Sequence, residues 1–251
     1  MGELVSIIMP CYNSESYIAV AIESVLAQSY VNWELLITDD CSTDGSVGVI
    51  KRYIALDDRI KLYSTSKNTG HPSEPRNISL KNSKGTYIAF LDSDDVWFPD
   101  KLKEQIDFIE RYNYDLITSY SEFIDSEGNS LGIISKSQKH ADYYDMLKKY
   151  QLSSPTIVCT ASIKDKLYFP SCKKEDYIAW LMVVKQGVVI HNTQMIHAYY
   201  RVSKNSRSRN KWSMLIEHWK ILRDTAKLNA LMALYYFLCY VFYSLKKYYR
   251  S

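Results

Sequence analysis

The sequence predicts an α/β protein with a mostly parallel central sheet flanked by helices. Two observations support this fold class. Short apolar runs alternate along the chain with segments whose apolar residues recur at helical spacing, and polar clusters directly follow three of those runs. Continuous apolarity is typical of strands covered on both faces, and strands that alternate with helices form largely parallel sheets.

The first half of the chain carries the alternation most clearly. Apolar runs predict strands, in order, at Val5–Met9, Trp33–Thr38, Ile60–Ser64 and Thr86–Leu91. Helical spacing predicts helices, in order, at Tyr17–Ala27, Ser46–Leu56, Arg76–Ser83 and Pro99–Tyr112. The segment Asn68–Pro75 between two of these elements is expected to be a loop.

The second half is more mixed, and no internal repeat or low-complexity linker interrupts it. We expect strands at Asp115–Tyr120 and Val188–His191, and helices at Asp142–Tyr150 and Glu175–Lys185. Apolar residues make up 47% of the chain and charged residues 24%, which excludes disorder as a description of the whole. A second lobe packed on the same sheet therefore fits better than a separate domain.

Polar clusters at 10–13, 39–44 and 92–95 each follow a predicted strand directly. In parallel sheets, ligands bind beyond the carboxyl ends of the strands. We therefore expect the three clusters to meet at one edge of the sheet and to form the functional site.

The cluster Asp92-Ser93-Asp94 brings two carboxylates close together. Hard oxygen ligands of this kind suit Mg²⁺ or Mn²⁺, and a cation would relieve their mutual repulsion. The residues alone also allow a solvated acidic turn, or a helix cap supplied by Asp94 or Asp95.

The two other clusters carry groups that suit a nucleobase. One carboxylate of Asp39-Asp40 could accept a hydrogen bond from a base, although Thr43 or Asp44 could instead cap the next helix. In Pro10-Cys11-Tyr12-Asn13 the aromatic ring could stack on a base, or it could be an ordinary side chain at the edge of the core.

Five blocks in this order and spacing resemble the inverting family-2 glycosyltransferases of the GT-A fold. The blocks span about residues 4–110: VSIIMPCYN (5–13), DDCSTD (39–44), NTG (68–70), RN (76–77) and FLDSDD (90–95). The resemblance implies a nucleotide-sugar-binding half at 1–115, an acceptor-binding half of the same domain at 116–200, and a C-terminal tail of basic loop and amphipathic helix at 201–251.

The resemblance also implies roles for individual residues. Those on the donor side are Pro10, Tyr12 and Asn13 in the nucleobase pocket, Asp39 on the base, Arg76 towards the diphosphate, and Asp92, Ser93 and Asp94 in the metal motif. Asp92 and Asp94 would hold Mn²⁺ or Mg²⁺, with Asp94 the direct ligand. Two departures stand out: Cys41 replaces a usual Gly, and 71–75 replaces small residues before Arg76, so the local turn and the sugar pocket are expected to differ.

The catalytic base is expected at the start of the helix Glu175–Lys185. In similar enzymes an acidic pair at this place supplies a carboxylate that takes the acceptor hydroxyl's proton, and Asp176 matches it, with Glu175 beside it. From the residues alone, both acids could simply favour a helix N-terminus. Trp180, one turn later, either stacks on an acceptor sugar or packs in the core.

The C-terminal part is strongly basic. Residues 1–200 hold 20 Lys or Arg against 26 Asp or Glu, whereas residues 201–251 hold 11 against 2. The stretch 201–211 is either a loop that closes over the donor diphosphate through Arg201 and Lys204, as in similar enzymes, or a solvated charged loop. Helical spacing is expected from Trp212 to Leu245.

The segment Leu228–Leu245 has no charged residue and has basic residues on both sides. On a helical wheel a tyrosine stripe (Tyr236, Tyr240, Tyr243) lies opposite a broad leucine face. This pattern favours a helix lying in a membrane interface; packing on the catalytic body or spanning the membrane are the alternatives.

The remaining signals concern location. Five cysteines without metal spacing indicate free thiols in a reducing compartment, and the N-terminus has no signal-peptide pattern. We therefore expect a cytoplasmic enzyme, peripheral on the inner face of the plasma membrane. Its partners would be a nucleotide-sugar donor, for which the resemblance favours UDP, and a saccharide or lipid-linked saccharide acceptor in cell-surface polysaccharide synthesis.

Two other functions compete with sugar transfer. A nucleotidylyltransferase that makes sugar nucleotides usually has a Gly-rich basic loop after its first strand, and 10–16 has neither feature. A non-catalytic module could bind nucleotide or nucleic acid through the basic tail. Because the tail is rich in Tyr and Leu and no RNA-binding signature is present, we expect no nucleic-acid partner.

Overall fold

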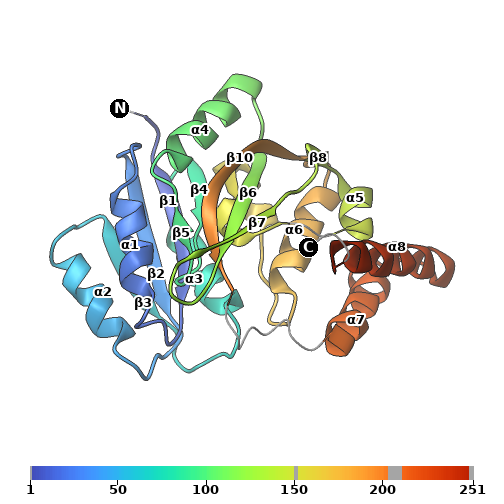
Figure 1. The fold of residues 1–251 in the computed structure, drawn as a ribbon, viewed down its shortest axis with the longest axis horizontal. Coiled ribbons are helices and arrows are strands. Elements are labelled where there is room, and N and C mark those ends of the chain that lie inside the picture. The colour runs from blue at the N-terminus through green and yellow to red at the C-terminus, as the bar shows by residue number, and fades with distance from the viewer. Residues whose placement is uncertain (1, 150–151, 203–210, 249–251) are drawn as a thin grey trace.

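The computed structural model describes residues 2–149, 152–202 and 211–248, and the strands form one mixed sheet (Figure 1). The strands are β1 (Val5–Cys11), β2 (Trp33–Asp39), β3 (Ile60–Ser64), β4 (Tyr87–Phe90), β5 (Val96–Trp97), β6 (Leu116–Ile124), β7 (Ser130–Ser135), β8 (His140–Ala141), β9 (Val158–Thr160) and β10 (Ile190–Arg201). Their order is β3-β2-β1-β4-β9-β6-β10-β5, with β7 on β6 and β8 on β10.

The sheet is parallel where the polar clusters lie. Strands β3, β2, β1 and β4 pair in parallel, and β1 lies between β2 and β4. The short strand β9 runs antiparallel to both β4 and β6, and β10 runs parallel to β6. The expectation of a mostly parallel sheet therefore holds for the first lobe, and the second lobe makes the sheet mixed.

Helices cover both faces of this sheet, as the continuous apolar runs predict. They are α1 (Ile18–Leu26), α2 (Ser46–Ile54), α3 (Ser73–Asn82), α4 (Lys101–Tyr112), α5 (Tyr143–Lys148), α6 (Glu175–Lys185), α7 (Lys211–Lys220) and α8 (Ala230–Tyr248). Neighbouring residues of a strand enter opposite cores: Ile7 packs with α1, α2 and α4, whereas Ile8 packs with α3 and α6.

The second lobe differs most from the expected elements. The sequence did not predict strands β5, β7, β8 and β9. Strands β5, β8 and β9 are too short to show a pattern, and β7 carries mostly exposed residues. Strand β10 continues to Arg201, ten residues past the expected end. Polar residues and register shifts at 192–198 interrupt its apolar pattern, and Gln194 has a left-handed backbone (φ 63°).

The C-terminal tail is two helices rather than the continuous one that helical spacing predicts. A π-helical turn at Ile221–Thr225 follows α7, and Lys227, with φ 58°, breaks the chain before α8. Ile221, Leu222 and Ala233 lie in the same core as α6. Within the described ranges, no helix combines the length and the apolarity that crossing a bilayer requires.

Gly85, just before β4, is expected to tolerate no side chain. A Cβ there would lie 2.6 Å from the carbonyl oxygen of Leu4 and 2.6 Å from the nitrogen of Ser6, both backbone atoms of the neighbouring strand. Because overpacking costs about 1–3 kcal/mol, we expect Gly85→Ala to lower the free energy of unfolding by about 2 kcal/mol in urea titrations.

Gly48 provides the matched control for that substitution. It lies exposed within α2, and a Cβ there would meet nothing within 4 Å. Gly48→Ala should raise the free energy of unfolding by up to about 1 kcal/mol, since Ala favours helices over Gly. Equal stability of the two variants would contradict the close strand contact at Gly85.

Candidate functional site

The three polar loops do meet at one edge of the sheet. Cys11 pairs with Asp39 at the ends of β1 and β2, so the loops that follow leave the sheet side by side. The side-chain oxygen of Asn13 accepts a hydrogen bond from the backbone nitrogen of Thr43 at 2.8 Å, and the hydroxyls of Ser14 and Ser93 lie 2.7 Å apart. Hydrogen bonds thus join the loop after β1 to both of the others.

The candidate nucleobase side combines a fixed carboxylate with an open ring. Asp39 is buried, and its carboxylate accepts hydrogen bonds from the backbone nitrogen and the hydroxyl of Ser42. Tyr12 is 49% exposed, so a ligand can reach its side chain. Pro10 lies buried at the end of β1. This arrangement suits a flat ring that carries N–H donors.

Asp40 has a structural role that the sequence did not predict. Its carboxylate accepts from the hydroxyl of Thr65 at 2.9 Å and from the backbone nitrogen of Thr69 at 3.0 Å. These bonds tie the loop after β3 to the end of β2. Cys41 keeps a left-handed backbone (φ 59°), so this turn has the conformation that a glycine would adopt freely.

The carboxylates of the acidic turn after β4 differ in their exposure to solvent. Asp92 and Asp94 are half-buried, whereas Ser93 and Asp95 are buried. Burial, and then the charges of Asp94 and Asp92, raise the pKa of Asp95 well above its usual value. One of its oxygens accepts from the backbone nitrogen of Arg201, and the other, Oδ2, has no hydrogen-bond partner.

These residues fit a divalent cation. Among the residues that the structure describes, no group of three or more His, Cys, Asp or Glu side chains is arranged to hold a metal ion by itself. Mg²⁺, however, typically takes one or two carboxylates and completes its shell with water and substrate phosphates. Asp92 and Asp94 supply such a pair, and Asp95, whose buried Oδ2 has no hydrogen-bond partner, lies beside them.

Arg76 joins the acidic turn to the start of α6. Arg76 is 4% exposed, and its guanidinium lies 2.6 Å from an oxygen of Asp92 and 3.2 Å from an oxygen of Glu175. Burial alone would lower the pKa of Arg76, but Asp92 and Glu175 raise it above its ordinary value, so the side chain stays charged. The structure thus shows a link between two acidic motifs, and a contact with diphosphate stays a prediction.

Arg201 holds the acidic turn after β4 through hydrogen bonds to backbone carbonyls. Its guanidinium donates to the carbonyl oxygens of Asp94, Asp125 and Ser126, at 2.8, 2.9 and 3.1 Å respectively, and lies over the ring of Tyr17. The side chain is buried, and its Nε and Nη1 donate to backbone carbonyls, so the structure gives Arg201 a structural role, and the contact with phosphate stays a prediction. Lys204, paired with it in that expectation, lies outside the described residues.

We expect Arg201→Met to lower the free energy of unfolding by about 2 kcal/mol, because three partly buried carbonyls lose their donor and an unsatisfied buried polar group costs about 1–3 kcal/mol. Urea unfolding measures this, and the affinity for UDP should fall as the acidic turn loosens. Arg223→Met is the control, since exposed Arg223 donates to the carbonyl of Leu228. Equal urea midpoints for the two variants would contradict a stabilising role for the backbone contacts of Arg201.

The acidic pair opens α6 as expected. Asp176 is half-buried, and one of its oxygens accepts from the backbone nitrogen of Tyr177 at 2.7 Å, while Glu175 is buried against Arg76. Trp180 is 1% exposed and packs edge-on against Phe90 with ring centres 5.3 Å apart. Its indole is therefore a core side chain, and the alternative of stacking on an acceptor sugar is wrong.

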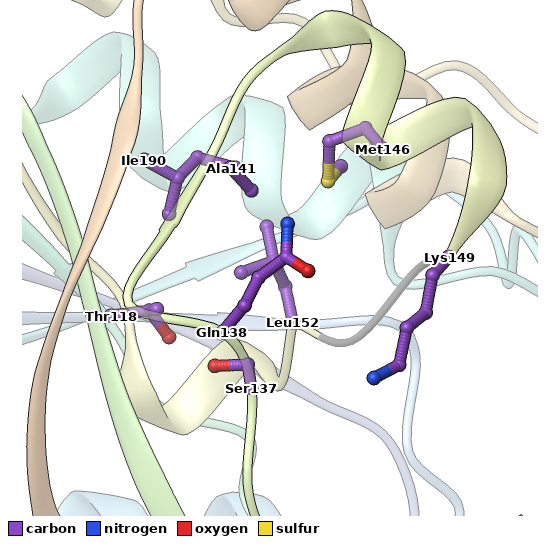
Figure 2. A pocket seen from close by; sticks show the side chains of 8 residues that line it. All are labelled: Thr118, Ser137, Gln138, Ala141, Met146, Lys149, Leu152 and Ile190. Carbon is purple, nitrogen blue, oxygen red and sulfur yellow. The ribbon is translucent and has the colours of Figure 1, made fainter.

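A small pocket lies away from these residues, beside β6 and α5 (Figure 2). Its lining comprises Thr118, Ser137, Gln138, Ala141, Met146, Lys149, Leu152 and Ile190. None of the residues predicted for the functional site lines it. The donor-side residues gather instead at the open edge formed by the loops after β1, β2 and β4.

The chain matches a sequence model described as "Glycosyl transferase family 2" over residues 6–168. It is 37% identical over 247 residues to an Escherichia coli protein, UDP-Glc:alpha-D-GlcNAc-diphosphoundecaprenol beta-1,3-glucosyltransferase WfgD, covering 97% of this chain and 94% of that protein. It is 34% identical over 246 residues to TuaG of Bacillus subtilis, a glycosyltransferase provisionally assigned to teichuronic acid biosynthesis, with 97% of each chain covered.

The fold also matches solved structures. The Staphylococcus aureus protein TarS (residues 1–349), solved with UDP-GlcNAc, superposes with a TM-score of 0.71 over 91% of this chain and 69% of that one, at 22% identity. At that identity the likeness shows the GT-A-like fold and nothing finer. These comparisons give no support to a nucleotidylyltransferase or to a nucleic-acid-binding module.

Proposed function

Because the chain belongs to glycosyltransferase family 2, we propose that it moves a sugar from a UDP-sugar to a hydroxyl of a lipid-linked saccharide, with inversion at the anomeric carbon. The relative WfgD is named for transfer from UDP-glucose to a diphosphoundecaprenol-linked sugar, which supports both substrate classes. Residues 1–115 form the donor half, and residues 116–200 form the acceptor half of the same domain.

Asp176 is the proposed base. Inverting transfer needs one carboxylate that takes the acceptor hydroxyl's proton while the oxygen attacks the anomeric carbon in line with the departing diphosphate. Asp176 opens α6 in the acceptor half, and Arg76 holds its neighbour Glu175 together with Asp92 of the acidic turn. This link between the base-bearing helix and the donor-side turn is the observation that carries the proposal.

The donor side follows from the three loops. Tyr12 stacks on the base, Asp39 accepts from its N–H, and Pro10 and Asn13 shape the pocket. Asp92 and Asp94 would hold Mn²⁺ or Mg²⁺, which would supply positive charge for the diphosphate. Support comes from the open ring of Tyr12, the buried carboxylate of Asp39 and the paired acids of the turn.

The test is transfer from UDP-glucose to an N-acetylglucosaminyl diphospholipid, followed by mass spectrometry of the lipid. One added hexose that requires the lipid-linked sugar is the expected product. UDP-GlcNAc and UDP-galactose follow in parallel, because the donor sugar is a separate choice from the acceptor class. Failure with each donor, in protein that binds UDP, would reject the acceptor class.

We also propose that α8 lies on the inner face of the plasma membrane, which makes the enzyme peripheral and cytoplasmic. Two members of the tyrosine stripe face inwards, since Tyr236 is buried and Tyr240 stacks on His218, whereas Tyr243 is 37% exposed. The leucine face points outwards, with Leu231 81% exposed, and exposed Leu234, Leu238 and Phe242 continue it. An apolar face beside basic residues suits an anionic bilayer surface.

Vesicle sedimentation tests the membrane contact. The double variant Leu231→Glu/Leu238→Glu should bind phosphatidylglycerol vesicles at least about tenfold more weakly, because burying one Leu is worth about 1.5–3 kcal/mol. Leu56→Glu is the matched control, as Leu56 is 83% exposed in the segment between α2 and β3. Unchanged sedimentation of the double variant would reject α8 as the contact.

A further inference from the structure

Four side chains from the start of α6, from α7 and from α8 form a buried cluster, which we call the anchor cluster: Lys174, Tyr177, His218 and Tyr240. The ring of His218 stacks on that of Tyr240 with centres 3.8 Å apart and lies 5.4 Å from the ring of Tyr177. The ammonium of Lys174 donates to the hydroxyl of Tyr240 at 3.3 Å and lies 4.6 Å from its ring centre. The cluster joins three helices at one point.

Lys174 carries the charge of this cluster. His218 is fully buried, neither of its ring nitrogens has a hydrogen-bond partner, and burial together with Lys174 lowers its pKa to about 3. The imidazole is therefore neutral at physiological pH and acts as a flat packing surface. Lys174 is 7% exposed, so its ammonium depends on Tyr240 and on nearby acids for stabilisation.

Lys174 connects the anchor cluster to the proposed catalytic base. It directly precedes Glu175 and Asp176, and the charge of Asp176 favours its protonated form. Helices α7 and α8 lie beside α6 (Figure 1), and Tyr177 shares a core with Ile221, Ala233 and Tyr236 of the tail. The start of α6 is thus held from two sides, by Arg76 through Glu175 and by Tyr240 through Lys174.

We propose that Lys174 is a positioning residue for the transfer reaction, which fixes the start of α6, and with it Asp176, against the C-terminal helices by its contact with Tyr240. The inference rests on the proposed role of Asp176 as base. It makes α7 and α8 part of the acceptor side of the active site, in addition to any contact that the outer face of α8 makes with lipid.

Steady-state transfer and UDP calorimetry test this on the full chain. Lys174→Met should lower kcat about tenfold, which is less than the loss of about 10²–10⁴-fold expected when the base itself is removed, and should leave the affinity for UDP unchanged within about twofold. Tyr240→Phe keeps the ring on His218 and loses the hydroxyl, so a smaller fall, about threefold, is expected. Lys174→Arg should restore most of kcat. Lys185→Met is the matched control, because Lys185 contacts the tail carbonyl of Ala226 at the other end of α6.

A pH profile separates positioning from mere packing. Burial lowers the pKa of Lys174 to about 8, opposed by Asp176 and Glu217. The groups that face Lys174 are Asp176 and Tyr177 of α6, Glu217 and His218 of α7, and Tyr240 of α8. Because the ammonium is lost as pH rises through about 8, kcat of the parent should fall there, and kcat of Lys174→Arg should not.

The outcomes are distinct. Parental kcat in folded Lys174→Met, together with parental kcat in Tyr240→Phe, would overturn the inference, and so would pH profiles that coincide for the parent and Lys174→Arg. If Lys174→Met does not fold, Tyr240→Phe and the profile of Lys174→Arg decide. Activity retained by Asp176→Asn would instead remove the base assignment, and the inference with it, whereas an inactive Asp176→Asn leaves the Lys174 result to stand by itself.

Discussion

Asp176→Asn is expected to lower kcat about a thousandfold, since a positioned general base contributes about 10²–10⁴-fold. The amide keeps the size of the side chain and can still accept from the backbone nitrogen of Tyr177, as the carboxylate does at 2.7 Å. It has no basicity with which to take the acceptor's proton. Steady-state transfer measures kcat, and UDP calorimetry should show unchanged donor affinity.

The control for Asp176 is Asp58→Asn. Asp58 is exposed just before β3, at the end of the sheet opposite the site, so kcat should remain parental. A kcat of Asp176→Asn within about tenfold of the parent would contradict its assignment as the base, because removal of a general base costs more than that.

Arg76→Met is expected to have the second large effect, on stability as well as on activity. It leaves the carboxylates of Asp92 and Glu175 without the guanidinium that lies 2.6 and 3.2 Å from them. Removing one partner of a buried ion pair costs about 3–5 kcal/mol, so the free energy of unfolding in urea should fall by about that amount. Transfer should fall as well, since the same side chain links the acidic turn to α6.

Two further variants identify the cause. Arg76→Lys retains the charge without the planar fork, so it should recover only part of the stability. In Arg76→Met/Glu175→Gln the buried carboxylate is neutralised, and this double variant should be more stable than Arg76→Met alone. A double variant whose loss equals the sum of the two single losses would contradict the ionic link between the lobes.

Much of the first lobe follows from sequence pattern alone. The runs that become β1, β2 and β4 are buried on both faces, and the helical spacing of apolar residues alone locates α1, α2 and α4 to within two residues. The end of β1 meets that of β2 because parallel strands share an edge, so the convergence of the three loops needed no structure. Helix α3 begins at Ser73, inside the segment expected to be a loop, since Pro75 is tolerated in a first helical turn.

The second lobe could not be predicted to the same degree. Strand β10 carries polar residues and shifts register, so periodicity fails to locate its end. Burial of Arg201 and Trp180 is set by distant partners, namely the backbone of the turn after β6 and the ring of Phe90. Composition alone gives no sign of either contact.

The sequence also could not predict which side of the C-terminal helix packs on the rest of the protein. The helical wheel separates the packed Tyr236 and Tyr240 from the leucine face, although Tyr243 of the predicted stripe is exposed. Which side meets the body depends on aromatic partners from other elements. His218 and Lys174 both contact Tyr240, so this part of the tyrosine stripe packs on the body. The exposed leucine face is the surface on which the proposed membrane contact depends.

The most direct test of the central proposal, a UDP-sugar site built on the acidic turn after β4, is calorimetry with UDP in the presence and absence of Mn²⁺. We expect the parent to bind UDP with Mn²⁺, and Asp94→Ala to bind at least about tenfold more weakly, a loss of about 1.4 kcal/mol. UDP binding without need of the metal, or equal affinity in Asp94→Ala, would contradict the metal site. Failure of the folded parent to bind UDP at all would contradict the donor proposal.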